Sequence, residues 1–288
     1  MTEVVRGFYD ENIEREWSRL DEPLCRLEFA STLRLIERYF PSEGFVCDIG
    51  GGPGRYTLEL LRRGYRVTLL DLSPGLLKRA ERALVDAGVT ADALLHCDAC
   101  NLTNLPSAYF DAALLLGPLY HLVDRSQRLN ALRELSRVLK PGGRAVVAYL
   151  NSWGILRCGI ADFPERYADL NFLLSLLGEK AFRGSLKGFT ESYWTTPDVA
   201  LREVASVGFE VVSYAGAEGF AGGMRPIIGR IVAERPSVLS NLERMAAETC
   251  ELLQYRDATE HLHIVVRNQS PSDTQPGAPA DAPKAACR

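Results

Sequence analysis

From Phe45 onward, short apolar runs alternate with stretches that have helical spacing of their apolar residues. The runs typical of buried strands lie at 45–49, 66–70, 93–97, 110–116, 144–150, 208–214 and 261–267. The helical stretches lie at 54–64, 74–87, 125–139 and 197–206. Because parallel strands joined by helices need cover on both faces, this alternation predicts an α/β fold with a mostly parallel seven-stranded sheet between helices.

Three segments depart from the alternation. Residues 1–40 carry helical periodicity, and residues 151–196 interrupt the pattern after the fifth strand, which predicts a helical insertion. Residues 268–288 combine four prolines and five alanines without an apolar period, so we expect a disordered tail. The core is therefore predicted in two blocks, 41–150 and 197–267.

The first predicted strand runs into a glycine-rich turn, with glycines at 50, 51, 52 and 54, and Asp71 ends the second strand. Such a turn lets the backbone approach a ligand closely, and a carboxylate at this edge can accept hydrogen bonds from a ribose diol. A dinucleotide site wants G-x-G-x-x-G/A, but the sixth position is Arg55 or Thr57. The stretch instead reads D-x-G-x-G-x-G from Asp48 to Gly54.

With this motif the chain resembles the class I S-adenosylmethionine-dependent methyltransferases, which implies a Rossmann-like fold and S-adenosyl-L-methionine as cofactor. The resemblance assigns Asp71, with Leu72 beside it, to the ribose, and Asp98, followed by Ala99, to the adenine amino group. Gly117 to His121 correspond to the segment where the methyl group meets the acceptor. Asp48 is either a ligand of the cofactor ammonium or a buried acid that organises the loop, and both roles are compatible.

The N-terminal stretch FYDENIEREW resembles a segment that folds over the cofactor as a lid in small-molecule members of the family. The resemblance implies that Tyr9 contacts the methionine part of the cofactor and that Trp17 or Arg19 lines the acceptor pocket. The alternative is an amphipathic helix whose aromatic residues only pack on the sheet.

His121 and Tyr120 are the candidate catalytic residues and also candidate acceptor contacts. His121 can act as a general base or simply hold the acceptor or the backbone, and Tyr120 can contact the acceptor or pack. Methyl transfer is an in-line displacement, so alignment and exclusion of water can supply most of the rate and a dedicated base is optional.

The insertion is rich in aromatic residues, with eight between Trp153 and Trp194. An aromatic-lined pocket favours a flat hydrophobic acceptor, and Trp153 is the predicted contact. Alternatively, these aromatic residues bury one another or form a dimer interface.

Composition narrows the possible partners. A net charge of −4 without a basic cluster argues against nucleic acid, and the longest apolar runs are too short to span a bilayer. The N-terminus lacks the apolar core of a signal peptide, so we expect a cytoplasmic monomer or homodimer. The seven cysteines, including Cys97 and Cys100, lack the partners of a zinc site, and His261 and His263 are expected to be structural, so we predict no metal.

Together these features predict a methyltransferase that modifies a nitrogen, oxygen or carbon atom of a small, aromatic or heteroaromatic acceptor, and we place it in specialised metabolism. The alternatives are a methyltransferase for protein side chains and a non-catalytic partner subunit that binds S-adenosylmethionine.

Overall fold

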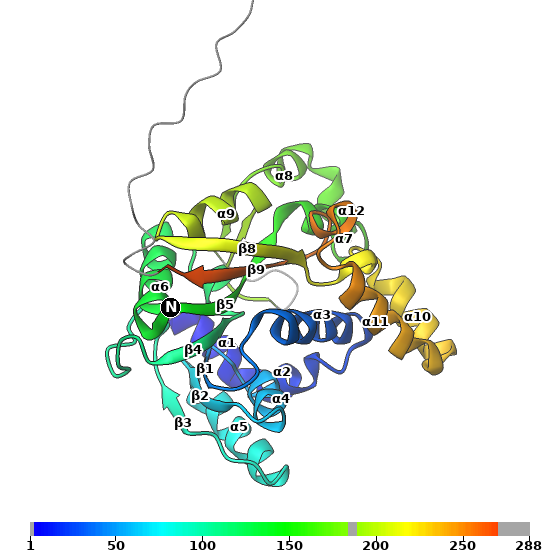
Figure 1. Cartoon of the computed structure of the whole chain (residues 1–288). Coiled ribbons are helices and arrows are strands. Elements are labelled where there is room, and N and C mark those ends of the chain that lie inside the picture. The colour runs from blue at the N-terminus through cyan, green and yellow to red at the C-terminus, as the bar shows by residue number, and fades with distance from the viewer. Residues whose placement is uncertain (1–2, 184–188, 270–288) are drawn as a thin grey trace, which may run out of the picture.

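The computed structural model describes residues 3–183 and 189–269, and its centre is a twisted sheet (Figure 1). Seven strands form the main sheet in the order β3-β2-β1-β4-β5-β9-β8, with β9 antiparallel to both neighbours and β1 to β5 parallel. They are β1 (Phe45–Ile49), β2 (Arg66–Asp71), β3 (Ala93–His96), β4 (Phe110–Leu115), β5 (Leu139–Asn151), β8 (Phe209–Gly216) and β9 (His261–Asn268). The predicted Rossmann-like, mostly parallel sheet is confirmed.

Helices cover both faces of the sheet because alternate strand residues are apolar on both sides. On one face lie α3 (Pro23–Tyr39), α4 (Arg55–Arg62) and α5 (Pro74–Asp86). On the other lie α6 (Arg125–Val138) and α9 (Pro197–Ala205). Val146 of β5 belongs to the first core and its neighbour Val147 to the second, both fully buried.

Two short helices, α1 (Glu3–Glu11) and α2 (Ile13–Arg19), precede α3 and pack on the beginning of α5. Asp10 Oδ1 accepts a hydrogen bond from Ser73 Oγ at 2.5 Å, and Ser73 also caps α5 by accepting from the backbone N–H of Leu76. Arg55 donates to the carbonyl of Trp17 at 2.7 Å. These contacts fix the N-terminal helices against the edge of the sheet where β1 and β2 end.

The insertion after β5 contains two strands in addition to the helices that the sequence predicts. Strand β7 (Ser192–Thr195) is parallel to the last residues of β5, and β6 (Lys180–Phe182) pairs antiparallel with β7. Strand β4 pairs with β5 only as far as Val147, so the end of β5 has an edge that β7 can occupy. The helices are α7 (Ser152–Asp162), η2 (Pro164–Ala168) and α8 (Leu170–Ser175).

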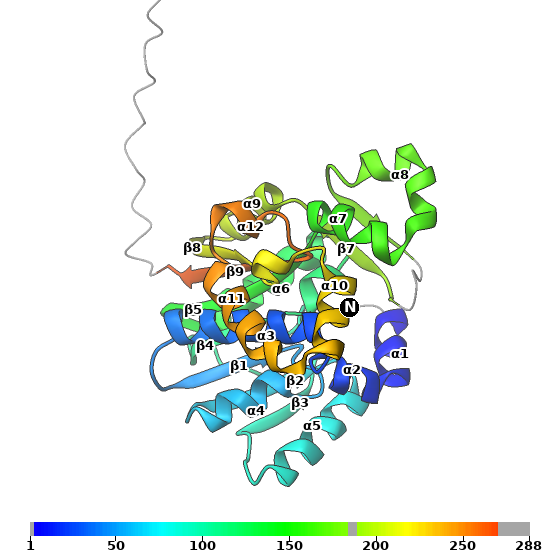
Figure 2. The ribbon, with the colours of Figure 1, turned by 90° about the vertical axis from the view of Figure 1, so that its right-hand side faces the viewer.

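A second insertion, between β8 and β9, was not predicted from the sequence. It comprises η3 (Gly219–Ala221), α10 (Arg225–Glu234), η4 (Pro236–Val238), α11 (Leu239–Thr249) and α12 (Leu253–Arg256). Figure 2 shows α10 and α11 lying along α3, where Ile228 and Ala246 bury Leu24 and Leu27. This packing makes α3 a buried layer between the sheet and the second insertion.

Three further observations concern the predicted tail, the cysteines and the apolar runs. The predicted tail begins at Asn268, which is the last residue of β9, and residues 270–288 lie outside the described part. The six cysteines described are free thiols. Among the described residues, no helix is both long and apolar enough to cross a bilayer.

Candidate functional site

A cavity opens where β1, β2 and β4 end, beneath α1 and α2, and holds about 820 Å³ including its mouth. Ten of the residues singled out from the sequence line it: Tyr9, Asp48, Gly50, Gly51, Gly52, Asp71, Leu72, Gly117, Tyr120 and His121. Arg19, one of the two alternatives for the acceptor pocket, also lines it. Residues from distant parts of the chain therefore share one site.

The glycine turn is folded tightly against the end of β2. The backbone N–H groups of Gly50 and Gly51 both donate to the carbonyl of Leu70, at 2.7 and 3.2 Å. Gly52 has φ = +58°, which non-glycine residues seldom adopt. A Cβ on Gly51 would lie 2.4 Å from Leu69 Cδ1. The turn therefore has no room for a side chain at position 51. Gly54 is the N-cap of α4 and lies outside the lining.

Asp71 is held in place by two backbone groups of this region. Its Oδ2 accepts from the N–H of Gly52 at 2.9 Å and its Oδ1 from the N–H of Ser73 at 2.8 Å. Burial raises the pKa of the Asp71 carboxyl to about 6, despite these donors. Each carboxylate oxygen has a further lone pair, so the group can accept a vicinal diol.

Asp48 lies under the same turn. Its Oδ2 accepts from the hydroxyl of Thr57 at 2.6 Å, and it lines the cavity. Burial raises the pKa of Asp48 to about 6, and the nearby charge of Asp71 adds to this. The geometry is compatible with both roles considered for Asp48, an organiser of the loop and a ligand for a cation.

Asp98 and Ala99 lie outside the cavity lining. Asp98 follows β3, whose last residue pairs with Asp71, and its Oδ1 accepts from the N–H of Cys100 at 2.9 Å. Ala99 is buried in the core. The assignment of this pair to an adenine ring remains a prediction.

Tyr9 and His121 join the N-terminal helices to the core. The Tyr9 hydroxyl lies 2.7 Å from His121 Nε2, and His121 Nδ1 lies 2.9 Å from the carbonyl oxygen of Glu191. A carbonyl only accepts, so Nδ1 carries the proton and Nε2 accepts from Tyr9. Burial lowers the pKa of His121 to about 4, so the ring is neutral near pH 7. A residue from α1, one from the core and one from the first insertion meet here.

The cavity is also lined by charged and phenolic side chains that the sequence analysis did not identify, namely Glu16, Glu28 and Tyr56. Arg19 Nη1 donates to Glu28 Oε2 at 3.0 Å, and Arg19 Nε donates to Glu16 Oε1 at 3.0 Å. A signal for Glu28 existed in the sequence, because this acid lies one turn after Leu24 on the apolar stripe of a helix.

The two tryptophans predicted as acceptor contacts lie outside the lining. The ring of Trp17 lies under the guanidinium groups of Arg79 and Arg55, at 3.8 and 5.0 Å. Trp153, 36% exposed, is the second residue of α7. The roles of both residues in acceptor binding remain predictions.

Most aromatic residues of the first insertion pack among themselves. Phe163, Phe172 and Trp194 form a separate buried cluster, and Phe182 stacks on Trp194. This matches the alternative that these residues bury one another. Phe189 is the member that approaches the site, with its ring 5.3 Å from that of His121.

Sequence comparison identifies residues 47–147 as a match to a family described as "Methyltransferase domain". The chain is 30% identical over 124 residues to the tRNA 5-carboxymethoxyuridine methyltransferase of Escherichia coli K12, covering 43% of this chain and 46% of the relative. It is 34% identical over 120 residues to the ubiquinone biosynthesis O-methyltransferase of Xylella fastidiosa 9a5c, covering 41% and 47%. The chain thus spans about half the length of these relatives.

Structural comparison extends the similarity to nearly the whole chain. The 1,6-didemethyltoxoflavin-N1-methyltransferase of Burkholderia thailandensis, solved with 1,6-didemethyltoxoflavin and S-adenosylhomocysteine, superposes with a TM-score of 0.57 at 17% identity. The match covers 93% of this chain and 88% of that one. At this identity the similarity concerns the fold.

Proposed function

We propose that the chain, whose residues 47–147 match a family of methyltransferase domains, transfers a methyl group from S-adenosyl-L-methionine to a small-molecule acceptor. One observation carries the proposal: the glycine turn, Asp71, Tyr9 and His121 line a single cavity. This cavity combines a cradle for an adenosyl group with a neighbouring polar chamber. The N-terminal helices that cover it would then act as the lid.

The residues present fit the cofactor. Gly51 has no room for a Cβ, which keeps the turn flat, and both oxygens of Asp71 have lone pairs to spare beyond their backbone donors. In this proposal Asp71 and Leu72 bind the ribose and Asp48 faces the ammonium group. The remaining contacts are assigned to Gly50, Gly52, Gly54 and Gly117 at the turn, Tyr9 at the methionine part, and Asp98 with Ala99 at the adenine.

When bound, the cofactor supplies an electrophilic methyl group, and the chain supplies alignment and a dry site. His121 holds the Tyr9 hydroxyl through Nε2, while Tyr120 lies beside the reacting edge. A pKa near 4 makes His121 a weak base, so we assign it mainly to positioning Tyr9. The Tyr9 oxygen keeps a lone pair that can accept a hydrogen bond from a ligand while its own hydrogen is donated to Nε2.

For the acceptor we propose a small aromatic or heteroaromatic molecule, methylated at nitrogen, oxygen or carbon. The rings of Tyr9, Tyr56 and Tyr120 in the lining support this, in place of the aromatic residues of the insertion. A net charge of −4 favours such a molecule over RNA, although one relative is named for tRNA. We propose that the chain works as a monomer or homodimer without a metal.

Two measurements test the proposal. Isothermal titration calorimetry with S-adenosylhomocysteine should show saturable binding to one site. Turnover of S-adenosylmethionine should then be followed with a panel of small phenols, aromatic amines and indoles, with unmodified tRNA and a protein lysate as controls. Absence of cofactor binding would refute the methyltransferase assignment, and turnover only with tRNA or protein would refute the small-molecule acceptor.

A further inference from the structure

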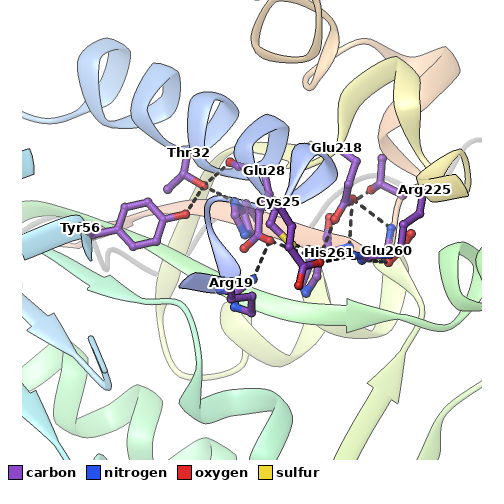
Figure 3. A network of polar contacts seen from close by, with 12 residues as sticks. Arg19, Cys25, Glu28, Thr32, Tyr56, Glu218, Arg225, Glu260 and His261 are labelled. Atoms are coloured by element: carbon purple, nitrogen blue, oxygen red, sulfur yellow. Dashed lines mark hydrogen bonds and ion pairs between the residues drawn. The ribbon is translucent and has the colours of Figure 1, made fainter. Parts of the chain in front are cut away.

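A chain of charged side chains runs from Arg19 and Glu28, which line the cavity, to residues at the two ends of the second insertion (Figure 3). It begins with Arg19 and Glu28 and continues to His261, whose Nδ1 lies 4.0 Å from Glu28 Oε2 and donates to Glu218 Oε1 at 2.6 Å. Glu218 Oε2 accepts from the backbone N–H groups of Glu260 and His261. The side chains of Glu28 and Glu218 are only 8% and 2% exposed.

Within this network, Glu28 and His261 lie at the end of the site away from Asp71, whereas the charge of Glu16 also acts on Asp71. Asp71 ends β2, whereas His261 begins β9, and in the sheet β1, β4 and β5 separate these strands. The ring of Tyr120 lies between the two ends, 4.8 Å from that of His121 and 6.4 Å from that of His261. If Asp71 binds the ribose, we place the acceptor on the side of Tyr120 where Glu28 lies.

The charges of Glu16, Arg19 and Glu28 do not balance one another. Glu16 and Glu28 share the single guanidinium group of Arg19. Burial would raise the pKa of Glu28, but Arg19 and His261 outweigh it and hold the pKa at about 2, so Glu28 is ionised near neutral pH.

The neighbouring cations are already engaged. Burial would lower the pKa of His261, but Glu28 and Glu218 raise it to about 9, and the resulting imidazolium is bound directly by Glu218. Arg225 is shared by Glu22 and Glu260. One negative charge is thus left over among the described groups Glu16, Arg19 and Glu28.

The other arginines of the lining do not compensate for it. Arg6 pairs with Glu3, and Arg55 pairs with Asp21 at 2.8 Å, and both of these acids lie outside the lining. Arg19 and His261 already stabilise the ionised form of Glu28, so a cationic ligand would add to these ion pairs and neutralise the negative charge that Glu16, Arg19 and Glu28 leave over. Two phenol rings, Tyr56 and Tyr120, line the same end and offer faces that attract cations.

We propose that the acceptor carries one protonated nitrogen group, an ammonium or amidinium, that binds the carboxylate of Glu28 beside Tyr56 and Tyr120. This proposal rests on the proposed function and defines its acceptor further, as a monocationic small molecule whose methylated atom lies on the side of Tyr9. Glu16 and Arg19 fix the carboxylate of Glu28, and the links to His261 and Glu218 hold it through the second insertion.

Three phenols that differ mainly in the charge of their side chain test the proposal: tyramine, 4-ethylphenol and 3-(4-hydroxyphenyl)propionate. Each is titrated by calorimetry into the full chain saturated with S-adenosylhomocysteine at pH 7.5. We expect tyramine to bind at least tenfold more tightly than either of the others. Equal affinities, or a preference for the anion, would overturn the proposal.

Glu28→Gln should reduce the preference for tyramine to less than threefold, while S-adenosylhomocysteine binds with unchanged affinity. Glu37→Gln, in the same helix but largely exposed and outside the cavity, is the matched control and should retain the preference. A preference that persists in Glu28→Gln, or a loss of S-adenosylhomocysteine affinity instead, would overturn the proposal. If Glu28→Gln does not fold, Glu16→Gln on α2 replaces it and should reduce the preference at least threefold.

The two proposals fail differently. A protein that does not bind S-adenosylhomocysteine contradicts the methyltransferase assignment. A protein that binds it and methylates neutral phenols as readily as cationic ones retains the assignment and loses only the cationic acceptor.

Discussion

Replacing Asp71 by asparagine separates cofactor binding from folding. In the wild type, both carboxylate oxygens accept backbone N–H bonds, from Gly52 and Ser73. The introduced amide would present an NH₂ group to one of these donors and would carry no negative charge. The substitution keeps the size of the side chain, so its effects reflect charge and hydrogen bonding.

The stability of the cofactor-free chain should change little, because two effects oppose each other. A pKa of about 6 for Asp71, against 3.8 for a free aspartate, corresponds to about 3 kcal/mol that disfavours the folded state at pH 7. Asparagine removes this cost but leaves one buried donor without an acceptor, which costs about 1–3 kcal/mol. We therefore expect the free energy of unfolding to change by less than about 2 kcal/mol.

The affinity of Asp71→Asn for S-adenosylhomocysteine should change far more than its free energy of unfolding. A hydrogen bond to a charged group contributes about 1.5–3 kcal/mol. If Asp71 binds the ribose as proposed, the variant loses one such bond and weakens the other. A loss of about 3 kcal/mol corresponds to about 150-fold weaker binding of S-adenosylhomocysteine. Calorimetry gives the affinity and urea unfolding the stability, with Asp86→Asn, exposed at the end of α5, as control.

The pH dependence has a defined sign. Because the folded-state pKa of Asp71 is raised, the folded chain binds more protons between pH 4 and 6, and the contribution of Asp71 to stability falls as pH rises through that window. The affinity for S-adenosylhomocysteine should instead rise with pH, because ionised Asp71 is the better hydrogen-bond acceptor. We expect a gain of about tenfold from pH 5 to 7. The affinity profile of Asp71→Asn should be shallower. A variant that binds within threefold of the wild type at pH 7.5 would refute the ribose assignment.

Three further substitutions or conditions probe the turn, the core and the buried histidines. Gly51→Ala should abolish binding of S-adenosylhomocysteine in calorimetry, because its Cβ has no room in the turn, and retained affinity would contradict this geometry. Glu203→Gln should lower the free energy of unfolding by about 3–5 kcal/mol in urea titrations, since it breaks the ion pair with buried Arg128, and a loss under about 1 kcal/mol would argue against it. Burial lowers the pKa of His121 and of His263 to about 4. The unfolded chain therefore takes up more protons than the folded chain as pH falls from about 6.5 to 4. Over this range each histidine lowers the free energy of unfolding by up to about 3 kcal/mol. His263→Asn should show a smaller acid-induced loss in urea unfolding at pH 7.5 and 5, and an identical loss would contradict this linkage.

Local patterns accounted for the elements on the side of the site where we propose that the cofactor binds. The strand at 45–49, the glycines after it and the acid at the end of the next strand are encoded within 27 residues. Their placement follows from short-range backbone geometry, and the structure has β1 with the same bounds. The helices after the turn and after Ser73 also begin where the glycine and cap residues indicate.

Two parts of the fold were not predicted from the sequence, for different reasons: the helical insertion between β8 and β9, and the β6–β7 pair. Helices α10 and α11 have apolar residues that pack on α3, a partner about 200 positions away in the chain. Strand β7 forms because β5 continues beyond the last residue that pairs with β4. The free edge at the end of β5 depends on the register of β4 and β5, not on the sequence of β7.

The side chains at the proposed acceptor end of the cavity are the part of the site that the sequence predicted least well. The excess of aromatic residues between 153 and 194 is real, but tertiary packing turns most of it into a separate small core. The chemical character of the far end of the cavity comes from Glu28 and His261, which are far apart in the chain and nearly adjacent in space.

The sequence by itself determined the α/β architecture, the nucleoside-type turn and the residues on it, because periodicity and glycine geometry act over a few residues. Only the tertiary structure decided which side chains surround the acceptor end and which charge they leave unbalanced. The Glu16–Arg19 pair is local, three residues apart on one helix, but burial and the contacts of Glu28 with Arg19 and His261 are properties of groups that the tertiary structure brings together.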